Sequence, residues 1–243
     1  MVTNPVRGGN VLKFRQRLIP CKFLKRDNRF LATVLIEGKK HQVHVPNSGR
    51  LQEILTPRRE VFLFPAVKCD AKRKTEYTLV MSRYGAGYVS IEAAKANDFF
   101  EEALNSGVIS EFASHRVVQR EKRIGLSRVD FFLEDTSGAK TYLEVKSVTL
   151  VVNETAMFPD APTKRGRKHL KELIGLREKG VNAATAFIIQ RSDVKSFSPN
   201  GQEDPGYKEI LKEAFNAGVK IIAYKCSVNR EEIYVTDPVP VIL

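Results

Sequence analysis

One stretch of the sequence indicates the architecture most clearly: SRVDFFLEDTSGAKTYLEVKSVTL, residues 127–150. Two apolar runs flank the turn-forming residues 135–138, DTSG, and this pattern predicts a β-hairpin. Asp130 lies early in the first strand, and Glu144 and Lys146 lie in the second. Because side chains alternate along a strand, Glu144 and Lys146 project from the same face, with Asp130 across the hairpin. The hairpin therefore predicts two carboxylates and a lysine at one edge of a sheet.

These three residue types suit metal-dependent hydrolysis of a phosphodiester. Two carboxylates hold a hard cation such as Mg²⁺ or Mn²⁺ through oxygen ligands. The cation lowers the pKa of a bound water, and a lysine stabilises charge that grows on the phosphate. Glu101 and Glu102, in an upstream helical segment, offer a third carboxylate. A salt bridge across an ordinary hairpin contains the same residue types, so spacing alone leaves both interpretations open.

The elements around the hairpin predict a mixed sheet flanked by helices. Helix formers dominate residues 91–105, and apolar residues recur at helical spacing in 163–179 and 205–217. Further strands are expected at residues 117–120, 183–190, 219–224 and 233–235.

The first third of the chain has a different texture, with short strand-like runs and little helix. The strands are expected within residues 11–18, 21–36, 41–45, 61–67 and 77–82, with a short helix or turn at 51–55. Such a pattern is typical of a small barrel, of which the OB-fold is the common five-stranded case. Gly85-Ala86-Gly87 is interpreted as the junction, which gives units 1–86 and 87–243.

The charge of the chain is concentrated in the same third. The whole chain has a net charge of +12; residues 1–90 contain 18 basic and 6 acidic residues, whereas residues 91–243 contain 22 of each. An asymmetry of this kind favours a module that binds a polyanion, although a surface that serves only solubility would have the same balance. We therefore expect DNA, double- or single-stranded, or RNA as the partner.

Several basic residues of this part are candidates for phosphate contacts. Residues 11–18 alternate so that one face of the strand is basic, and a second group surrounds the turn at Asp27-Asn28. The candidates are Lys13, Arg15, Arg17, Lys22, Lys25, Arg26 and Arg29. Phe23, Phe30 and Tyr84 would either stack on bases or belong to the core.

A second basic segment follows the carboxylates, at residues 164–171, KRGRKHLK. Thr163 is a plausible N-cap for a helix there. Arg165, Arg167 and Lys168 near a helix start suit a phosphate backbone, and a solvated helix face is the alternative. His169 is either a structural hydrogen-bonding residue or an acid–base group.

Other features narrow the class of protein. No apolar run approaches the roughly 20 residues of a membrane span, and the N-terminus lacks the apolar stretch of a signal peptide. Three widely spaced cysteines and four histidines match neither a disulfide framework nor a zinc site. We expect a cytoplasmic protein without a membrane partner; its oligomeric state is not indicated.

Five stretches together resemble the sugar fermentation stimulation protein A (SfsA) family. They are HVPNSGRL (44–51), SRVDFFL (127–133), YLEVKSVTL (142–150), FPDAPTKRGRKHLKEL (158–173) and IIQRSD (188–193). The resemblance implies an N-terminal OB-fold β-barrel and a C-terminal mixed α/β domain of the PD-(D/E)XK nuclease-like class, α+β overall. It also implies DNA binding of low sequence specificity and a regulatory link to sugar (maltose) metabolism.

The same resemblance implies roles for individual residues. Asp130, Glu144 and Lys146 match the catalytic aspartate, glutamate and lysine, and Glu102 matches the helix acid, with Glu111 as the alternative. Gln190 occupies a strand position where related nucleases place a polar residue. The chain departs from the family pattern at PNSGRL, where Arg50 becomes an additional candidate for a phosphate contact.

Three functions remain open at this stage. The chain is a DNA-binding regulator with a candidate divalent-metal phosphodiesterase site, an active nuclease on DNA or RNA, or a binding protein that keeps the nuclease fold as a scaffold. Fold alone does not decide among them.

Overall fold

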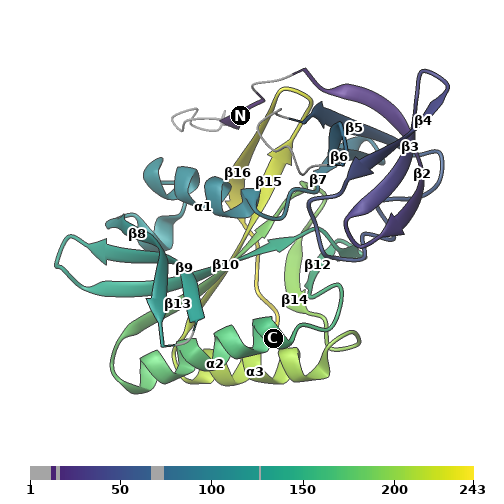
Figure 1. Ribbon diagram of the computed structural model, residues 1–243. Coiled ribbons are helices and arrows are strands. Elements are labelled where there is room, and N and C mark those ends of the chain that lie inside the picture. Colours follow the sequence, from purple (N-terminus) through teal and green to yellow (C-terminus); the bar gives the residue numbers. More distant parts are fainter. Residues whose placement is uncertain (1–11, 15–16, 67–73, 126) are drawn as a thin grey trace, which may run out of the picture.

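The computed structural model describes residues 12–14, 17–66, 74–125 and 127–243 (Figure 1). Among these residues no helix has the length and apolar content needed to cross a membrane. The predicted basic residue Arg15 lies outside the described residues, and the side chain of Lys13 is not described.

Five strands of the first part close into a barrel. The order is β4 (Lys39–His44), β3 (Leu31–Ile36), β2 (Ile19–Asn28), β5 (Glu60–Pro65) and β6 (Tyr77–Tyr84), and a parallel pairing of β4 with β6 completes the ring. Alternate side chains of these strands form one apolar core, typical of small barrels. The OB-fold prediction is therefore confirmed.

The barrel sheet continues beyond the expected junction. Gly85 and Ala86 form the turn of a hairpin between β6 and β7 (Gly87–Ser90), and Gly85 adopts a positive φ there. Residues 51–55 form turns and no regular helix. We propose that the division between the two units falls after β7.

The second part contains a seven-stranded mixed sheet. Its order is β1 (Leu12–Lys13), β16 (Glu232–Pro238), β15 (Lys220–Val228), β13 (Asn182–Ile189), β10 (Lys140–Val148), β9 (Ser127–Asp135) and β8 (His115–Ile124). The parallel pairs β10–β13 and β13–β15 form its buried centre, and antiparallel pairs lie on either side. The mixed sheet expected from the sequence is confirmed.

Helices cover both faces of this sheet (Figure 1). α1 (Lys95–Asn105) packs on one face, and α2 (Lys164–Glu178) and α3 (Pro205–Asn216) pack on the other. The hydroxyl of Thr163 accepts the Gly166 N–H, which confirms Thr163 as the N-cap of α2. A single 3₁₀ turn, Ser110–Phe112, follows α1.

Two parts of the topology differ from expectation. Leu12 and Lys13 pair with Ile233 and Glu232 of β16, so β1 belongs to the large sheet and not to the barrel. A three-stranded sheet of β11 (Val151–Val152), β12 (Thr155–Phe158) and β14 (Ser196–Pro199) was not expected. Both depend on pairings between distant segments, which local side-chain periodicity does not encode.

Candidate active site

The site forms where strands β9 and β10 separate. Their pairing runs from Glu134 opposite Lys140 to Phe131 opposite Leu143 and ends there. Asp130 and Glu144 are the next residues on the two strands. The Val145 N–H donates to Asp130 Oδ2 at 2.7 Å, so the carboxylate replaces a strand neighbour. The alternation of side chains along the strands and the separation of β9 from β10 together bring both carboxylates to the same end of the hairpin pairing.

Asp130 is held by two donors and buried beside a second negative group. Besides Val145, the Asn97 amide of α1 donates to Asp130 Oδ1 at 2.9 Å. Burial and the neighbouring Glu144 charge raise the pKa of Asp130, although Lys146 and the two hydrogen bonds oppose them.

The pKa of Glu144 is shifted in the opposite direction, downward. Its burial disfavours the charged form, but the positive charge of Lys146 and the His169 hydrogen bond outweigh burial and lower its pKa. Lys146 Nζ and His169 Nδ1 both contact the same oxygen, Oε1. The other oxygen, Oε2, is buried and has no hydrogen-bond partner among the residues that the structure describes. A buried, unpaired carboxylate oxygen is costly unless a ligand uses it.

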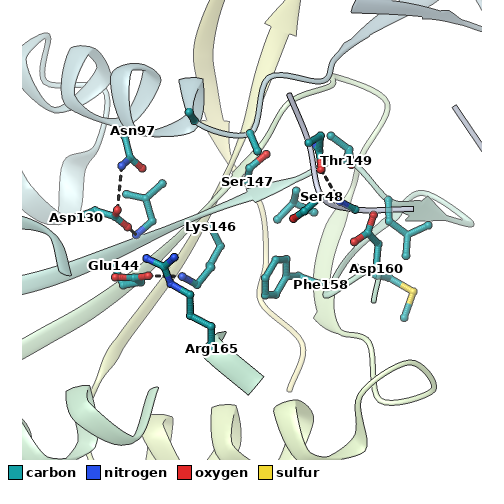
Figure 2. Close-up of a pocket in the computed structure, with 18 residues that line it drawn as sticks. Ser48, Asn97, Asp130, Glu144, Lys146, Ser147, Thr149, Phe158, Asp160 and Arg165 are labelled. Atoms are coloured by element: carbon teal, nitrogen blue, oxygen red, sulfur yellow. Dashed lines mark hydrogen bonds and ion pairs between the residues drawn. The ribbon is translucent and has the colours of Figure 1, made fainter. Parts of the chain in front are cut away.

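A cavity of about 470 Å³ opens onto these groups. Figure 2 shows Asp130, Glu144 and Lys146 at one end and Ser48 and Asp160 at the other. The walls come from both parts of the chain, because Asn47, Ser48 and Gly49 follow the barrel strand β4. The barrel is therefore part of the site.

The barrel segment 47–50, hereafter the rim loop, is fixed by Arg26. The five guanidinium N–H groups of Arg26 donate to five backbone carbonyls, those of Asn28, Arg29, Asn47, Gly49 and Arg50. A guanidinium has only five donors. Arg26 therefore has none left for a phosphate, and the prediction that it binds nucleic acid is not supported; Arg26 organises the rim loop.

Asp160, in the segment between β12 and α2, fixes the rim loop from the other side. Its carboxylate accepts the backbone N–H groups of Arg50 and Leu51, and burial raises its pKa. A Cβ atom at Gly49 would overlap this carboxylate, so only glycine allows the close approach. The Asn47 side chain also bonds Ile91 O at 3.0 Å.

The start of α2 supplies two further groups at the cavity. Arg165 is exposed and lines the cavity, as Figure 2 shows. Its Nε lies 3.4 Å from His169 Nε2, and His169 in turn contacts Glu144. The capped start of α2 thus brings Arg165 and His169 toward the carboxylate on β10.

Three acidic or polar candidates lie elsewhere. Glu102 does not line the cavity, and Asn97 is the α1 residue that reaches Asp130. Glu111 accepts the Tyr224 hydroxyl at 2.5 Å. Gln190 is buried and donates to Glu92 O and to Ser147 Oγ, so it supports the strand behind the cavity.

A groove of about 690 Å³ lies beside the cavity, on the barrel. Ser48 and Gly49 line both, so the two depressions adjoin along the rim loop. Lys25, Arg29 and Arg50 line the groove. Lys25 forms an ion pair with Asp27 at 3.1 Å, and Arg29 is exposed.

The remaining predicted basic residues are placed differently. Arg17 and Lys22 are exposed but do not line either depression. Arg50 forms a two-point ion pair with Glu203, with distances of 2.9 and 2.6 Å. Arg167 pairs with the buried Asp204, which caps α3, and is therefore structural. Lys168 is half exposed beside Glu172.

The three aromatic residues that were candidates for base stacking differ in their exposure and surroundings. Phe23 is buried in the barrel core. Tyr84 lies between the guanidinium groups of Arg59 and Arg191, at 5.1 and 4.3 Å from its ring centroid. Phe30, at the tip of the β2–β3 hairpin, is 49% exposed. Phe30 alone of the three is available to a ligand.

Asn97 and Asp160 were not predicted from the sequence as parts of the site, and of the rim loop Arg50 alone was. Asp160 stands in FPDAP, one of the stretches that carried the family resemblance. Asn97 had no local signal, because its role depends on how α1 docks against β9. His169 was left undecided and proves to be a partner of Glu144.

The fold and site define a class: a two-domain protein with an OB-fold barrel and a PD-(D/E)XK nuclease-like domain, in which the core order is α1, β8, β9, β10, α2, β13. The family model described as "SfsA N-terminal OB domain" matches residues 24–91. The model "Sugar fermentation stimulation protein RE domain" matches residues 94–232. The chain belongs to the sugar fermentation stimulation protein family.

Individual relatives agree. A sugar fermentation stimulation protein homolog of Caldanaerobacter subterraneus is 45% identical over 93% of this chain and 97% of its own. A homolog of Clostridium tetani is 43% identical over 91% of this chain and 96% of its own. The solved structure of Pyrococcus furiosus SfsA in complex with Ca²⁺ is similar, with a TM-score of 0.87 and 33% identity over 96% of this chain and 99% of that one.

Proposed function

We propose that this protein binds DNA with low sequence specificity and hydrolyses its phosphodiester bonds with the help of a divalent cation, Mg²⁺ or Mn²⁺. Asp130 and Glu144 would hold the cation, and Lys146 would stabilise charge on the scissile phosphate. The bound cation would polarise the phosphate and lower the pKa of a water molecule.

The observation that supports the proposal most strongly is how the two carboxylate oxygens of Glu144 are paired. Its Oε1 is occupied by Lys146 and His169, while its buried Oε2 lacks a partner. Together with Asp130, this oxygen is the donor type that Mg²⁺ prefers, and Mg²⁺ commonly uses one or two carboxylates plus water and phosphate oxygens. The described residues hold no group of three or more histidine, cysteine, aspartate or glutamate side chains that could hold a metal ion, so the proposal rests on these two carboxylates.

Two further points support the proposal. The Pyrococcus furiosus relative was solved with Ca²⁺, a divalent cation that also takes oxygen ligands. Lys25, Arg29 and Arg50 of the basic first third line the groove that adjoins the cavity at Ser48 and Gly49, as expected for a phosphate backbone that crosses both. The proposed link to sugar metabolism, including maltose, rests on the family resemblance and on the relatives' name alone.

Cleavage assays test this proposal. The purified protein is incubated with single- and double-stranded DNA and RNA, with Mg²⁺, with Mn²⁺ or with EDTA. We expect metal-dependent cleavage of DNA by the wild type. Lys146→Ala should lose cleavage by orders of magnitude yet keep most of its DNA affinity, because Lys146 acts mainly in the transition state.

The exposed Lys171 of α2 provides a matched control, because Lys171→Ala removes a lysine away from the cavity. This variant should cleave like the wild type. A wild type that cleaves no substrate with either metal would overturn the nuclease proposal and leave a DNA-binding scaffold. Cleavage of RNA alone would replace the DNA assignment.

A further inference from the structure

The shape of the site around the rim loop bears on which form of DNA it accepts. Glu144 is 4% exposed and Asp130 is half-buried, and both lie at one end of a cavity of about 470 Å³. Asn97 of α1, the rim loop and Arg165 all line this cavity. A phosphate must therefore enter a confined space to reach Asp130 and Glu144.

The rim loop is also rigid. Three donors of Arg26, the side chain of Asn47 and the carboxylate of Asp160 hold its backbone from two domains. The close packing of Gly49 against Asp160 leaves no room between them. The loop is thus a fixed wall, and the cavity does not widen by a simple displacement of this segment.

A single strand fits this geometry better than a duplex. Duplex DNA is stiff over about 150 base pairs and presents its phosphates on a broad surface. A single strand bends sharply, and its unpaired bases are free to stack on aromatic side chains along a charged groove. The cavity and the groove share Ser48 and Gly49 as lining residues, so a strand that leaves the cavity over this segment reaches the groove.

The far part of the path has the features of a single-strand groove. Arg29 is exposed there, and Lys25 and Arg50 also line it, each exposed but in an ion pair, with Asp27 and Glu203, that a phosphate could replace. Phe30 follows Arg29 directly, and its carbonyl accepts the Val45 N–H, two residues before the rim loop. Phe30 is 49% exposed, which leaves its ring free to stack on a base.

We infer that the segment of DNA at this site is single-stranded. One phosphate would lie at Asp130, Glu144 and Lys146, and neighbouring nucleotides would cross Ser48 and Gly49 into the barrel groove. A base that leaves the groove beside Arg29 would stack on Phe30, the next residue along the hairpin tip. This inference rests on the proposed function and adds the form of its substrate.

Binding measurements without divalent cations test the inference. Fluorescence anisotropy compares a labelled single-stranded oligodeoxynucleotide with the blunt duplex of the same sequence. We expect the single strand to bind more tightly. Phe30→Ala should weaken single-strand binding about 10-fold or more and leave duplex binding unchanged, and Phe30→Trp should restore it.

Phe215 provides the matched control, because it is 58% exposed but lies on α3, and not beside a groove residue of the barrel as Phe30 does. Phe215→Ala should change neither affinity. Equal or tighter binding of the duplex, or unchanged single-strand affinity of Phe30→Ala, would overturn the inference. Because no cation is present, these results are independent of cleavage: loss of the nuclease proposal alone would leave the single-strand preference and the Phe30 effect intact.

Discussion

His169 on α2 and Glu144 on β10 are joined through a single carboxylate oxygen, which leaves the second oxygen of Glu144 buried and unpaired. The imidazole thereby fixes the orientation of a side chain that we assign to the cation. His169 is a positioning residue in this account, since it acts through Glu144.

Replacing His169 should therefore weaken cation binding without unfolding the protein. We expect His169→Ala to reduce the affinity for Mn²⁺ by about 10- to 100-fold, the usual effect of removing a group that orients a metal ligand. Scanning calorimetry with and without excess Mn²⁺ measures this as a smaller cation-induced rise in Tm. His169→Gln, which keeps a donor, should restore part of the rise, and a full rise in His169→Ala would contradict the assignment.

The pH dependence of cation binding should depend on Lys146. Cation binding requires charged carboxylates, and burial raises the pKa of Asp130, so affinity should fall on acidification at a higher pH than an ordinary aspartate would give. Lys146 lowers the pKa of both Asp130 and Glu144. Lys146→Met should therefore shift the midpoint of Mn²⁺ binding to higher pH, whereas Lys168→Met should not. An unshifted midpoint would show that Lys146 is not coupled to the ligands.

Arg26 and Arg29 are neighbours in the groove with different predicted roles. Arg26→Gln should lower the free energy of unfolding by roughly 2–4 kcal/mol, because five backbone carbonyls lose a charged donor. Arg29→Gln should leave stability within about 0.5 kcal/mol but reduce the salt dependence of DNA binding by about one phosphate contact. Urea unfolding and anisotropy at several salt concentrations separate the two, and a stable Arg26→Gln would refute the structural role.

Replacing Gly49 and Gly175 by alanine should change the free energy of unfolding in opposite directions. Gly49→Ala places a methyl group against the buried Asp160 carboxylate and should destabilise the protein by about 1–3 kcal/mol. Gly175 lies within α2 with open space around it, so Gly175→Ala should stabilise by about 0.5–1 kcal/mol. Urea unfolding checks both signs, and an unaffected Gly49→Ala would mean that the rim loop is not closely packed.

The sequence predicts the features that depend on local periodicity. The alternation in residues 127–150 places Asp130, Glu144 and Lys146 together, and the barrel and the three helices follow from their own hydrophobic patterns. The pairing of β1 with β16 is not predictable in this way, because no local signal records contacts across more than 200 residues.

The positions of basic residues in the sequence predict the nucleic-acid contacts less well than hydrophobic periodicity predicts the helices and strands. In the sequence, Arg26 and Arg167 are basic candidates of the same kind as Arg29. In the structure, backbone carbonyls surround Arg26, and Arg167 pairs with the buried Asp204. Whether an arginine faces a ligand depends on the groups that tertiary structure places around it. Asn97 illustrates the same point for the candidate site.

The central claim is that Asp130 and Glu144 together bind a divalent cation, and titration calorimetry with Mn²⁺ tests it most directly. We compare the wild type with Asp130→Asn, which keeps the size of the side chain and removes its charge, at a pH above the raised pKa of Asp130. We expect the wild type to bind Mn²⁺ and the variant to lose binding, while circular dichroism shows that the variant keeps its fold. Equal binding heats for the two proteins would contradict it.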